Sequence, residues 1–135
     1  MTVTLGYVAF YVADVEETLS FYTAAFGLER RFITPEGDYG ELRTGATTLS
    51  FVSNDLAESN LAAVGGFARI DPTGKPPGMS LTLVTDDVPK ALNAALDAGA
   101  RPYLDPVDKP WGQTVAYVLD PNGILVELGT PVNAE

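Results

Sequence analysis

The sequence predicts an α+β fold made of two β-α-β-β-β modules. The first observation behind this prediction is a repeat: the strand-then-helix pattern of residues 7–27 returns in residues 80–99. The second is a long break between the two copies, where Gly65-Gly66 and Pro76-Pro77-Gly78 interrupt regular structure. The chain of 135 residues therefore divides into a module 1–53, a connection 54–78 and a module 79–132, which together form a single domain.

The first strand is expected over residues 7–12, where β-branched and aromatic residues predominate. Its side chains alternate between two faces. One face is wholly apolar and should contact the following helix: Val8, Phe10 and Val12. The other face carries Tyr7, Ala9 and Tyr11, so no metal ligand of the usual kind stands on the side that the helix leaves uncovered.

Each module contains one helix with an aspartate in the N-cap position, Asp14 in the first and Asp87 in the second. Glu17 follows Asp14 by three residues and can complete a capping box. Apolar residues then recur at helical spacing in both segments until Gly27 and Gly99, which are suited to ending a helix.

Three strands are expected after each helix, because short runs of β-formers alternate there with turn residues. In the first module these runs cover residues 30–33, 39–43 and 48–52. In the second module an initial strand at 80–85 precedes the helix, and three more follow at 101–104, 114–119 and 125–128. The connection between the modules begins with a short helical turn, and its length is typical of a linker or a functional lid.

The chain contains neither cysteine nor histidine. Disulfides, thiolate nucleophiles and zinc–thiolate sites are therefore excluded, and so is an imidazole base. A metal could be held only by oxygen donors and amides, which favours Ca²⁺ or Mg²⁺, and no EF-hand loop is present. We expect no cofactor.

The formal net charge of −10 argues against nucleic acid and against an anionic membrane surface as partners. A cationic small molecule would be attracted. No segment approaches the roughly 20 apolar residues of a membrane span. The N-terminus lacks a basic region before its apolar run, so a secretory signal is not expected and a cytoplasmic location is predicted.

Three segments carry a resemblance to a known family: YVADVEETLSFYTAAFGLE, VTDDVPKALNAALDAGA and KPWGQTVAYVLDPNGILVEL. Their order and duplication resemble the vicinal oxygen chelate superfamily, which includes glyoxalase I, extradiol dioxygenases and bleomycin-resistance proteins. The resemblance implies the glyoxalase/bleomycin resistance/dioxygenase fold, in which helices cover the convex faces of two curved sheets and the concave faces enclose a cavity. It also implies a homodimer, because members of the family often dimerise.

Metal-dependent members of that family place four cavity ligands, usually His, Gln or Glu, on the first and last strands of each module. The resemblance puts these positions at Tyr7, Ser50, Ser80 and Glu127. Only Glu127 is a good ligand, because a phenol with a pKa of about 10 and serine hydroxyls bind metals poorly at neutral pH. We therefore expect no metal site, and none of the glyoxalase or dioxygenase chemistry that depends on one.

Several side chains are candidates for binding a small-molecule ligand, and the aromatic ones each have a structural alternative. Tyr7 and Tyr11 form an aromatic wall with hydroxyl groups, or they fill the space that a metal leaves. Trp111 stacks on a ligand, closes one end of a barrel or lies in a dimer interface. Gln113 is an amide donor and acceptor. Glu41 is a further polar candidate whose strand register remains open.

Three functions are consistent with these features. The first is a metal-free small-molecule-binding protein that sequesters an antibiotic or another cationic or aromatic ligand, with Tyr7, Tyr11, Ser50, Ser80, Trp111, Gln113 and Glu127 at its site. The second is a glyoxalase-like lyase or isomerase with Glu127 as its acid/base. The third is a non-catalytic domain whose cavity is filled by its own side chains. A dioxygenase is disfavoured because histidine is absent.

Overall fold

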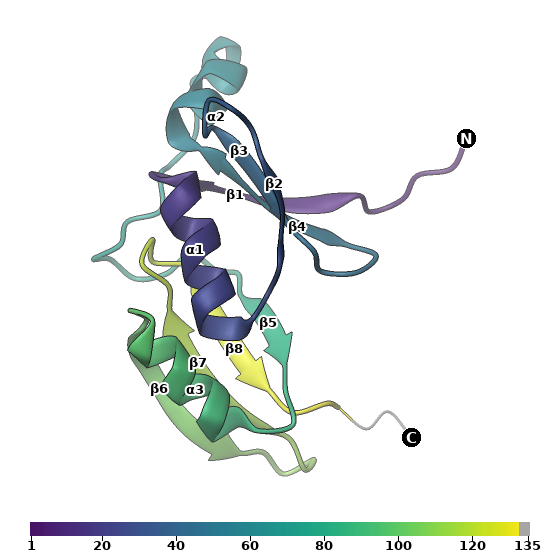
Figure 1. Cartoon of the computed structure of the whole chain (residues 1–135), viewed down its shortest axis with the longest axis vertical. Coiled ribbons are helices and arrows are strands. Elements are labelled where there is room, and N and C mark those ends of the chain that lie inside the picture. The colour runs from purple at the N-terminus through teal and green to yellow at the C-terminus, as the bar shows by residue number, and fades with distance from the viewer. Residues whose placement is uncertain (133–135) are drawn as a thin grey trace. The chain divides into compact units, whose positions relative to one another are not determined.

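The computed structural model describes residues 1–132 of the chain, which divide into two compact units (Figure 1). Unit 1 comprises Met1–Thr23 and Gly27–Arg69, and unit 2 comprises Ala24–Phe26 and, of the described residues, 70–132. Each unit contains one four-stranded sheet of mixed direction. The predicted α+β class and the duplicated β-α-β-β-β order are confirmed, and the boundary between the units falls within the predicted connection.

Unit 1 holds the first sheet, whose strand order is β1-β4-β3-β2. Strands β1 and β4 run parallel, and the other neighbours run antiparallel. The connection starts with a full helix where only a short turn was expected. The elements are β1 (Tyr7–Val12), α1 (Val15–Phe26), β2 (Arg30–Ile33), β3 (Tyr39–Leu42), β4 (Thr48–Ser53), α2 (Asn54–Leu61) and the 3₁₀ helix η1 (Ala62–Val64).

Unit 2 repeats this arrangement with the order β5-β8-β7-β6. Its elements are β5 (Leu81–Val84), α3 (Val88–Asp97), β6 (Arg101–Asp108), β7 (Thr114–Leu119) and β8 (Leu125–Gly129). Strand β6 extends four residues beyond the expected end at residue 104. It lies at the edge of the sheet, where Pro102 and Pro106 are tolerated because not every backbone N–H needs a partner.

Helix α1 covers one face of the first sheet. A Cβ atom on Gly40 would lie 2.6 Å from Leu19 Cδ1, so β3 approaches the helix closely at this glycine. The rings of Tyr22 on α1 and Phe51 on β4 are stacked with centroids 5.2 Å apart. Because side chains alternate along a strand, the neighbours of Gly40 and Phe51 point to the other side. We call that side the distal face of unit 1.

The second sheet also has one wholly apolar face. Val126 and Leu128 on β8 and Ala116 and Val118 on β7 are almost completely buried, and they share this face because they pair across the two strands. Helix α3 contacts β6, β7 and β8, which assigns the apolar face to the helix. The opposite side is the distal face of unit 2.

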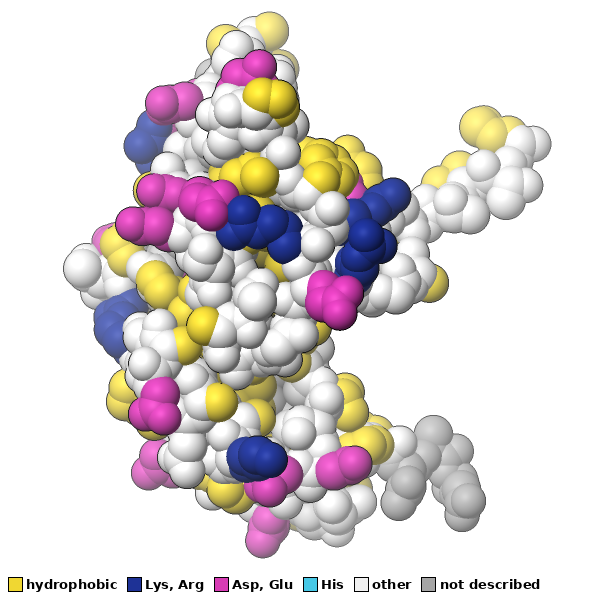
Figure 2. All heavy atoms as spheres, viewed as in Figure 1, with side chains coloured by type: hydrophobic (Ala, Val, Ile, Leu, Met, Phe, Trp, Pro, Cys, Tyr) yellow, Lys and Arg dark blue, Asp and Glu magenta, His cyan; other side chains and the backbone are white. Residues whose placement is uncertain are grey.

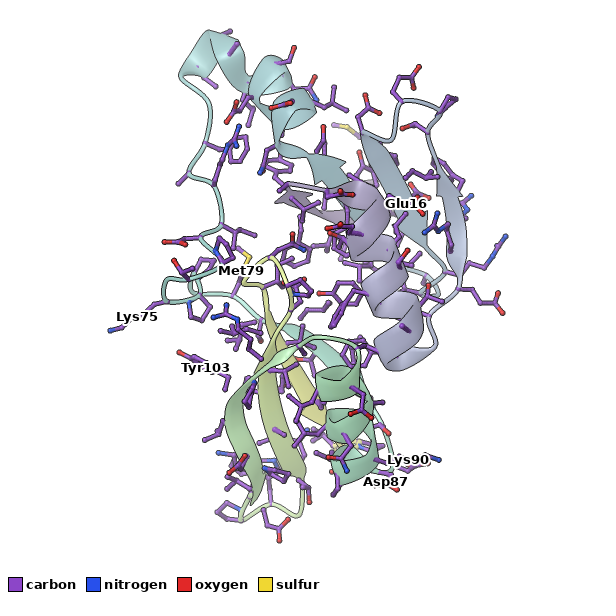
Figure 3. All side chains as sticks on the ribbon, turned by 60° about the vertical axis from the view of Figure 1, so that its left-hand side comes forward. Glu16, Lys75, Met79, Asp87, Lys90 and Tyr103 are labelled. Atoms are coloured by element: carbon purple, nitrogen blue, oxygen red, sulfur yellow. The ribbon has the colours of Figure 1, made fainter. Side chains whose placement is uncertain are left out.

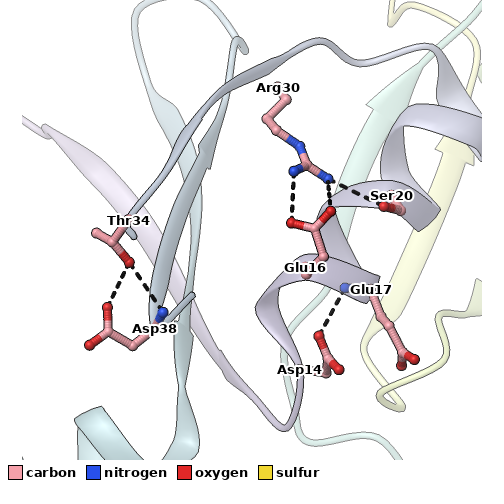
Figure 4. A network of polar contacts seen from close by, with 7 residues as sticks. All are labelled: Asp14, Glu16, Glu17, Ser20, Arg30, Thr34 and Asp38. Carbon is pink, nitrogen blue, oxygen red and sulfur yellow. Dashed lines mark hydrogen bonds and ion pairs between the residues drawn. The ribbon is translucent and has the colours of Figure 1, made fainter. Parts of the chain in front are cut away.

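Local hydrogen bonds confirm the predicted helix starts. Asp14 Oδ1 accepts the backbone N–H of Glu17 at 3.0 Å (Figure 4), and Asp87 Oδ1 accepts that of Lys90 at 3.1 Å in the first turn of α3 (Figure 3). Arg30 on β2 donates two hydrogen bonds to Glu16, at 2.8 and 2.9 Å, which join this edge strand to α1 (Figure 4). Bidentate geometry of this kind is the stronger form of a surface ion pair.

On the face seen in Figure 2, acidic and basic side chains are interspersed over both units, and the sequence has 18 acidic against 8 basic residues. This distribution agrees with the net charge of −10. Within residues 1–132, none of the helices has the length and apolar character that crossing a membrane requires.

Candidate functional site

The distal face of unit 2 carries Glu127 in the middle of a row of polar side chains. Thr82 on β5 and Tyr117 on β7 are the residues directly opposite Glu127 on β8. Side chains opposite one another on neighbouring strands share a face, so the three groups meet. Thr82 Oγ1 donates to Glu127 Oε1 at 2.8 Å, and the Tyr117 hydroxyl donates to Oε2 at 2.6 Å.

The two donors to Glu127 are both neutral. The hydrogen bond to Glu127 is the main reason that the pKa of Tyr117 is raised, followed by burial and the negative charge of the carboxylate. Tyr117 therefore stays a protonated donor at neutral pH. Within the described residues, neither lysine nor arginine forms an ion pair with Glu127. Its negative charge is hydrogen-bonded but not neutralised.

Aliphatic side chains lie on the same face as this carboxylate. Leu104 on β6 lies opposite Tyr117, and Val107 lies opposite Val115. Val84 at the end of β5 lies opposite Gly129. Leu104, Val107 and Val84 are all exposed to solvent. The distal face of unit 2 thus combines a half-buried negative charge with exposed aliphatic side chains.

Ser80 was predicted to share this site, but it lies just outside it. Strand β5 begins at Leu81, and Ser80 precedes it as an exposed residue. The residue that reaches Glu127 is Thr82, two positions further on. Sequence reasoning missed both Thr82 and Tyr117, because which residues face Glu127 depends on how β5 and β7 pair with β8.

Trp111 and Gln113 lie in the loop between β6 and β7. Trp111 is 63% exposed. Its Nε1 donates to Gln113 Oε1 at 3.0 Å, and Gln113 Nε2 donates to the carbonyl of Thr130 at 3.0 Å. The Gln113 amide therefore orients the indole ring, which leaves Trp111 as the group of this loop that a ligand or another protein can contact.

In unit 1, Ser50 and Tyr7 lie on the distal face but are not opposite one another. Ser50 pairs with Ala9 and Glu41, whereas Tyr7 pairs with Thr48. Ser50 is completely buried, and its hydroxyl donates to the carbonyl of Val8 at 3.3 Å. Tyr7 is exposed and therefore available to a ligand.

The main polar group of this face is Glu41, for which the sequence left the register open. It is only 9% exposed. Its Oε2 accepts the hydroxyl of Tyr39 at 2.5 Å, and its Oε1 accepts Arg31 Nη1 at 2.7 Å. The alternation Tyr39-Gly40-Glu41 was the signal that both side chains share a face. Unlike Glu127, this carboxylate is neutralised by an arginine.

Aromatic rings surround the Glu41 cluster. The Tyr39 ring lies edge-on to Tyr7 with centroids 6.5 Å apart, and its centroid is 5.8 Å from that of Phe32. Tyr11 contacts Phe67 in an edge-to-face arrangement at 4.8 Å. The distal face of unit 1 is thus largely aromatic, and its carboxylate, Glu41, is neutralised by Arg31.

The four positions implied by the family resemblance do not suit a metal ion. Ser50 donates its proton to a backbone carbonyl and is fully buried. Both carboxylate oxygens of Glu127 already accept hydrogen bonds. Tyr7 and Ser80 offer only neutral hydroxyls, which are poor ligands. Residues 1–132 contain no group of three or more His, Cys, Asp or Glu side chains arranged to hold a metal.

Comparisons with known proteins agree with this architecture. The model of the Glyoxalase/Bleomycin resistance protein/Dioxygenase superfamily matches residues 4–128, so the chain belongs to this superfamily. A family enzyme from Burkholderia phytofirmans PsJN is 23% identical, with a TM-score of 0.79 over 97% of this chain and 100% of that one.

Two further solved structures share the fold at lower identity. Lactoylglutathione lyase from Agrobacterium tumefaciens is 19% identical, with a TM-score of 0.69 over 96% of this chain and 95% of that one. TioX from Micromonospora sp. ML1 is 19% identical, with a TM-score of 0.68 over 95% of this chain and 98% of that one. No curated protein sequence matches the chain significantly. At these identities the similarity establishes the fold alone.

Proposed function

We propose that this protein is a metal-free small-molecule-binding protein of the glyoxalase/bleomycin-resistance type. The observation that carries the proposal is the environment of Glu127. Two neutral hydroxyls hold this carboxylate in place, and no cation among the described residues neutralises it. Exposed Leu104, Val107 and Val84 lie on the same face. A ligand with a cationic group and an apolar or aromatic body complements such a surface.

The net charge of −10 supports the same ligand class. An acidic surface raises the local concentration of cations and speeds their association. Cationic antibiotics of the bleomycin type combine positive charge with planar rings, so sequestration of such a compound is the biological role we propose. Trp111, exposed on the β6–β7 loop, is the single tryptophan of the chain, so its fluorescence can report binding.

Binding is favoured over acid/base catalysis because of how Glu127 is held. A general base needs a lone pair directed at the substrate proton. Here Thr82 and Tyr117 each donate to one carboxylate oxygen, which fixes the orientation of the group and takes up part of its capacity to accept protons. A fixed negative charge with this hydrogen bonding suits recognition of a cation better than transfer of a proton.

The proposal is tested by titrating bleomycin while following Trp111 fluorescence and melting temperature. Binding should raise the melting temperature with ligand concentration, and Glu127→Gln should weaken binding by about tenfold because a charged hydrogen bond is lost. Glu36→Gln makes the same charge change at an exposed turn of the other unit and should bind like the wild type. Equal affinity of the Glu127 and Glu36 variants would refute the role of Glu127.

A further inference from the structure

Phe67 lies outside regular structure, yet its ring packs on the distal face of unit 1. The centroids of Phe67 and Tyr11 are 4.8 Å apart, and the ring planes meet at 69°. Phe67 follows Gly65 and Gly66, whose φ angles of 90° and 80° lie in a region that glycine adopts at little cost. The chain thus turns back after η1 and lays an aromatic ring against β1.

A second attachment holds the same segment to α2. Arg69 Nε donates to Glu58 Oε1 at 2.7 Å, and Arg69 Nη2 lies 3.6 Å from Asp55 Oδ1. All three side chains are substantially exposed, so water and salt screen these ion pairs. We call residues 65–69 the strap. Backbone hydrogen bonds from Gly65 to Ala62 and from Gly66 to Leu61 anchor its first two residues. Beyond them, the strap is held by the Phe67 ring contact and by the exposed ion pairs of Arg69.

The surface beneath the strap is aromatic and carries no unneutralised carboxylate at its centre. Tyr11 and Tyr39 both lie opposite Val52 on β4, so the two rings flank the same buried side chain. Glu41, two residues beyond Tyr39, is neutralised by Arg31 at 2.7 Å. This surface differs from that around Glu127 in unit 2, where the charge is not neutralised. With no free carboxylate there, an uncharged ring complements this surface through the same edge-to-face packing that Phe67 makes with Tyr11.

We propose that the strap covers a subsite for an uncharged planar aromatic group, which packs against Tyr11 in place of Phe67 when the strap lifts. The inference rests on the proposed small-molecule-binding function and assigns a ligand class to the distal face of unit 1. Phe67 acts here as an internal competitor for the ring of Tyr11. The apparent affinity of the subsite then depends on the fraction of molecules in which the strap is open.

The test uses Nile red, an uncharged planar dye whose fluorescence rises in apolar surroundings, with the full chain in equilibrium and stopped-flow measurements. Tyr11→Ala should weaken binding about fivefold, the effect of losing one ring contact. Arg69→Ala and Phe67→Ala should each speed association severalfold, because they favour the open strap. High salt should speed association to the wild type and leave Arg69→Ala unaffected.

Two matched variants control for general effects. Arg43→Ala, just after the end of β3, removes the same charge as Arg69→Ala together with an exposed ion pair to Glu29. It should leave the association rate unchanged. Tyr103→Ala removes an exposed ring from β6 in unit 2 (Figure 3) and should leave affinity unchanged. Circular dichroism of each variant establishes that it is folded.

The outcomes separate this proposal from the proposed function. Absence of dye binding, or equal binding by Tyr11→Ala and Tyr103→Ala, would refute the subsite. Weaker binding by Phe67→Ala would make Phe67 a wall of the site and refute the strap as a competitor. If the subsite or the strap is refuted in this way and bleomycin still binds in a Glu127-dependent way, the proposed function is supported without the further inference. If the dye binds and bleomycin does not, the subsite is supported and the proposed binding of a cationic ligand is refuted.

Discussion

The hydroxyl of Tyr39 donates to Glu41 Oε2 at 2.5 Å, and both residues project from the same face of β3. The other carboxylate oxygen accepts Arg31 from the neighbouring strand β2 at 2.7 Å. A carboxylate that is only 9% exposed is tolerated when donors satisfy both of its oxygens. Tyr39, Glu41 and Arg31 therefore stabilise the sheet together. Removal of Glu41 leaves the donors of Tyr39 and Arg31 without this acceptor.

The first prediction concerns Glu41 itself. Glu41→Ala should lower the free energy of unfolding by roughly 1–3 kcal/mol, the usual cost of leaving a partly buried donor without an acceptor. Glu41→Gln should cost less, because an amide oxygen still accepts one hydrogen bond. Urea denaturation measures both values, with Glu36→Ala at an exposed turn as the control. Equal unfolding free energies of Glu41→Ala and Glu36→Ala would show that the cluster does not contribute to stability.

The second prediction is a pH dependence that belongs to Tyr39. Burial, and then the hydrogen bond to Glu41, raise the pKa of Tyr39 from 10.0 to about 12. The folded state thus favours the neutral phenol. Its contribution to stability is complete below pH 10.0 and is lost as the pH rises through about 12.

This loss should be absent from Tyr39→Phe, which has no proton to release at this position. The difference in unfolding free energy between the wild type and Tyr39→Phe should therefore shrink across that pH range in urea denaturation. Phenolate absorbance should also show one late-titrating tyrosine in the wild type that the variant lacks. A stability difference that stays constant with pH would contradict the assignment.

The order of elements was predictable because its signals are local. Asp14 and Asp87 act as caps through bonds to residues three positions away, and alternation along residues 7–12 separates a wholly apolar face from one that carries two tyrosines. Glycines indicate helix ends and turns to within one or two residues of where they stand. Such features need no knowledge of distant parts of the chain.

The polar clusters were harder to predict because strand pairing determines them. Glu41 could not be placed from sequence, since β2 and β3 pair with a register shift between Arg30 and Phe32. The partner of Glu127 is Thr82 rather than Ser80, because the pairing of β5 with β8 brings that residue opposite. A shift of one residue turns a side chain to the other face of its sheet.

The contact between the strap and β1 could not be predicted from the sequence either. Phe67 occupies a glycine-rich stretch without periodicity, so nothing in its neighbours indicates that it contacts Tyr11 on β1. The sequence supported only the general expectation that a connection of this length is a linker or a lid. The contact depends on how η1 ends and on the ion pairs of Arg69, and both are features of tertiary structure.

The third prediction concerns the contact between β3 and α1. A Cβ atom on Gly40 would lie 2.6 Å from Leu19 Cδ1 and 3.1 Å from Val15 Cγ1. Gly40→Ala should therefore destabilise unit 1 by about 1–3 kcal/mol, the typical cost of overpacking a core. Gly6→Ala is the matched control, since nothing lies within 4 Å of its added Cβ and its φ is not positive. Equal thermal stability of the two variants would show that α1 shifts freely to accommodate a methyl group.

The fourth prediction concerns Asn54, the first residue of α2. Its Oδ1 is buried and has no hydrogen-bond partner among residues 1–132. An unsatisfied buried acceptor is unfavourable, so its removal in Asn54→Ala should leave the unfolding free energy unchanged or raise it.

The preceding residue, Ser53, provides the comparison for Asn54. Its side chain accepts the backbone N–H of Leu56 at 3.1 Å as the cap of the same helix. Ser53→Ala should cost about 1 kcal/mol. Urea denaturation of both variants distinguishes the two roles at neighbouring positions. If Asn54→Ala were destabilised as much as Ser53→Ala, a donor would have to reach Asn54 Oδ1 in solution, and the carbonyl would be a satisfied part of the α2 N-terminus.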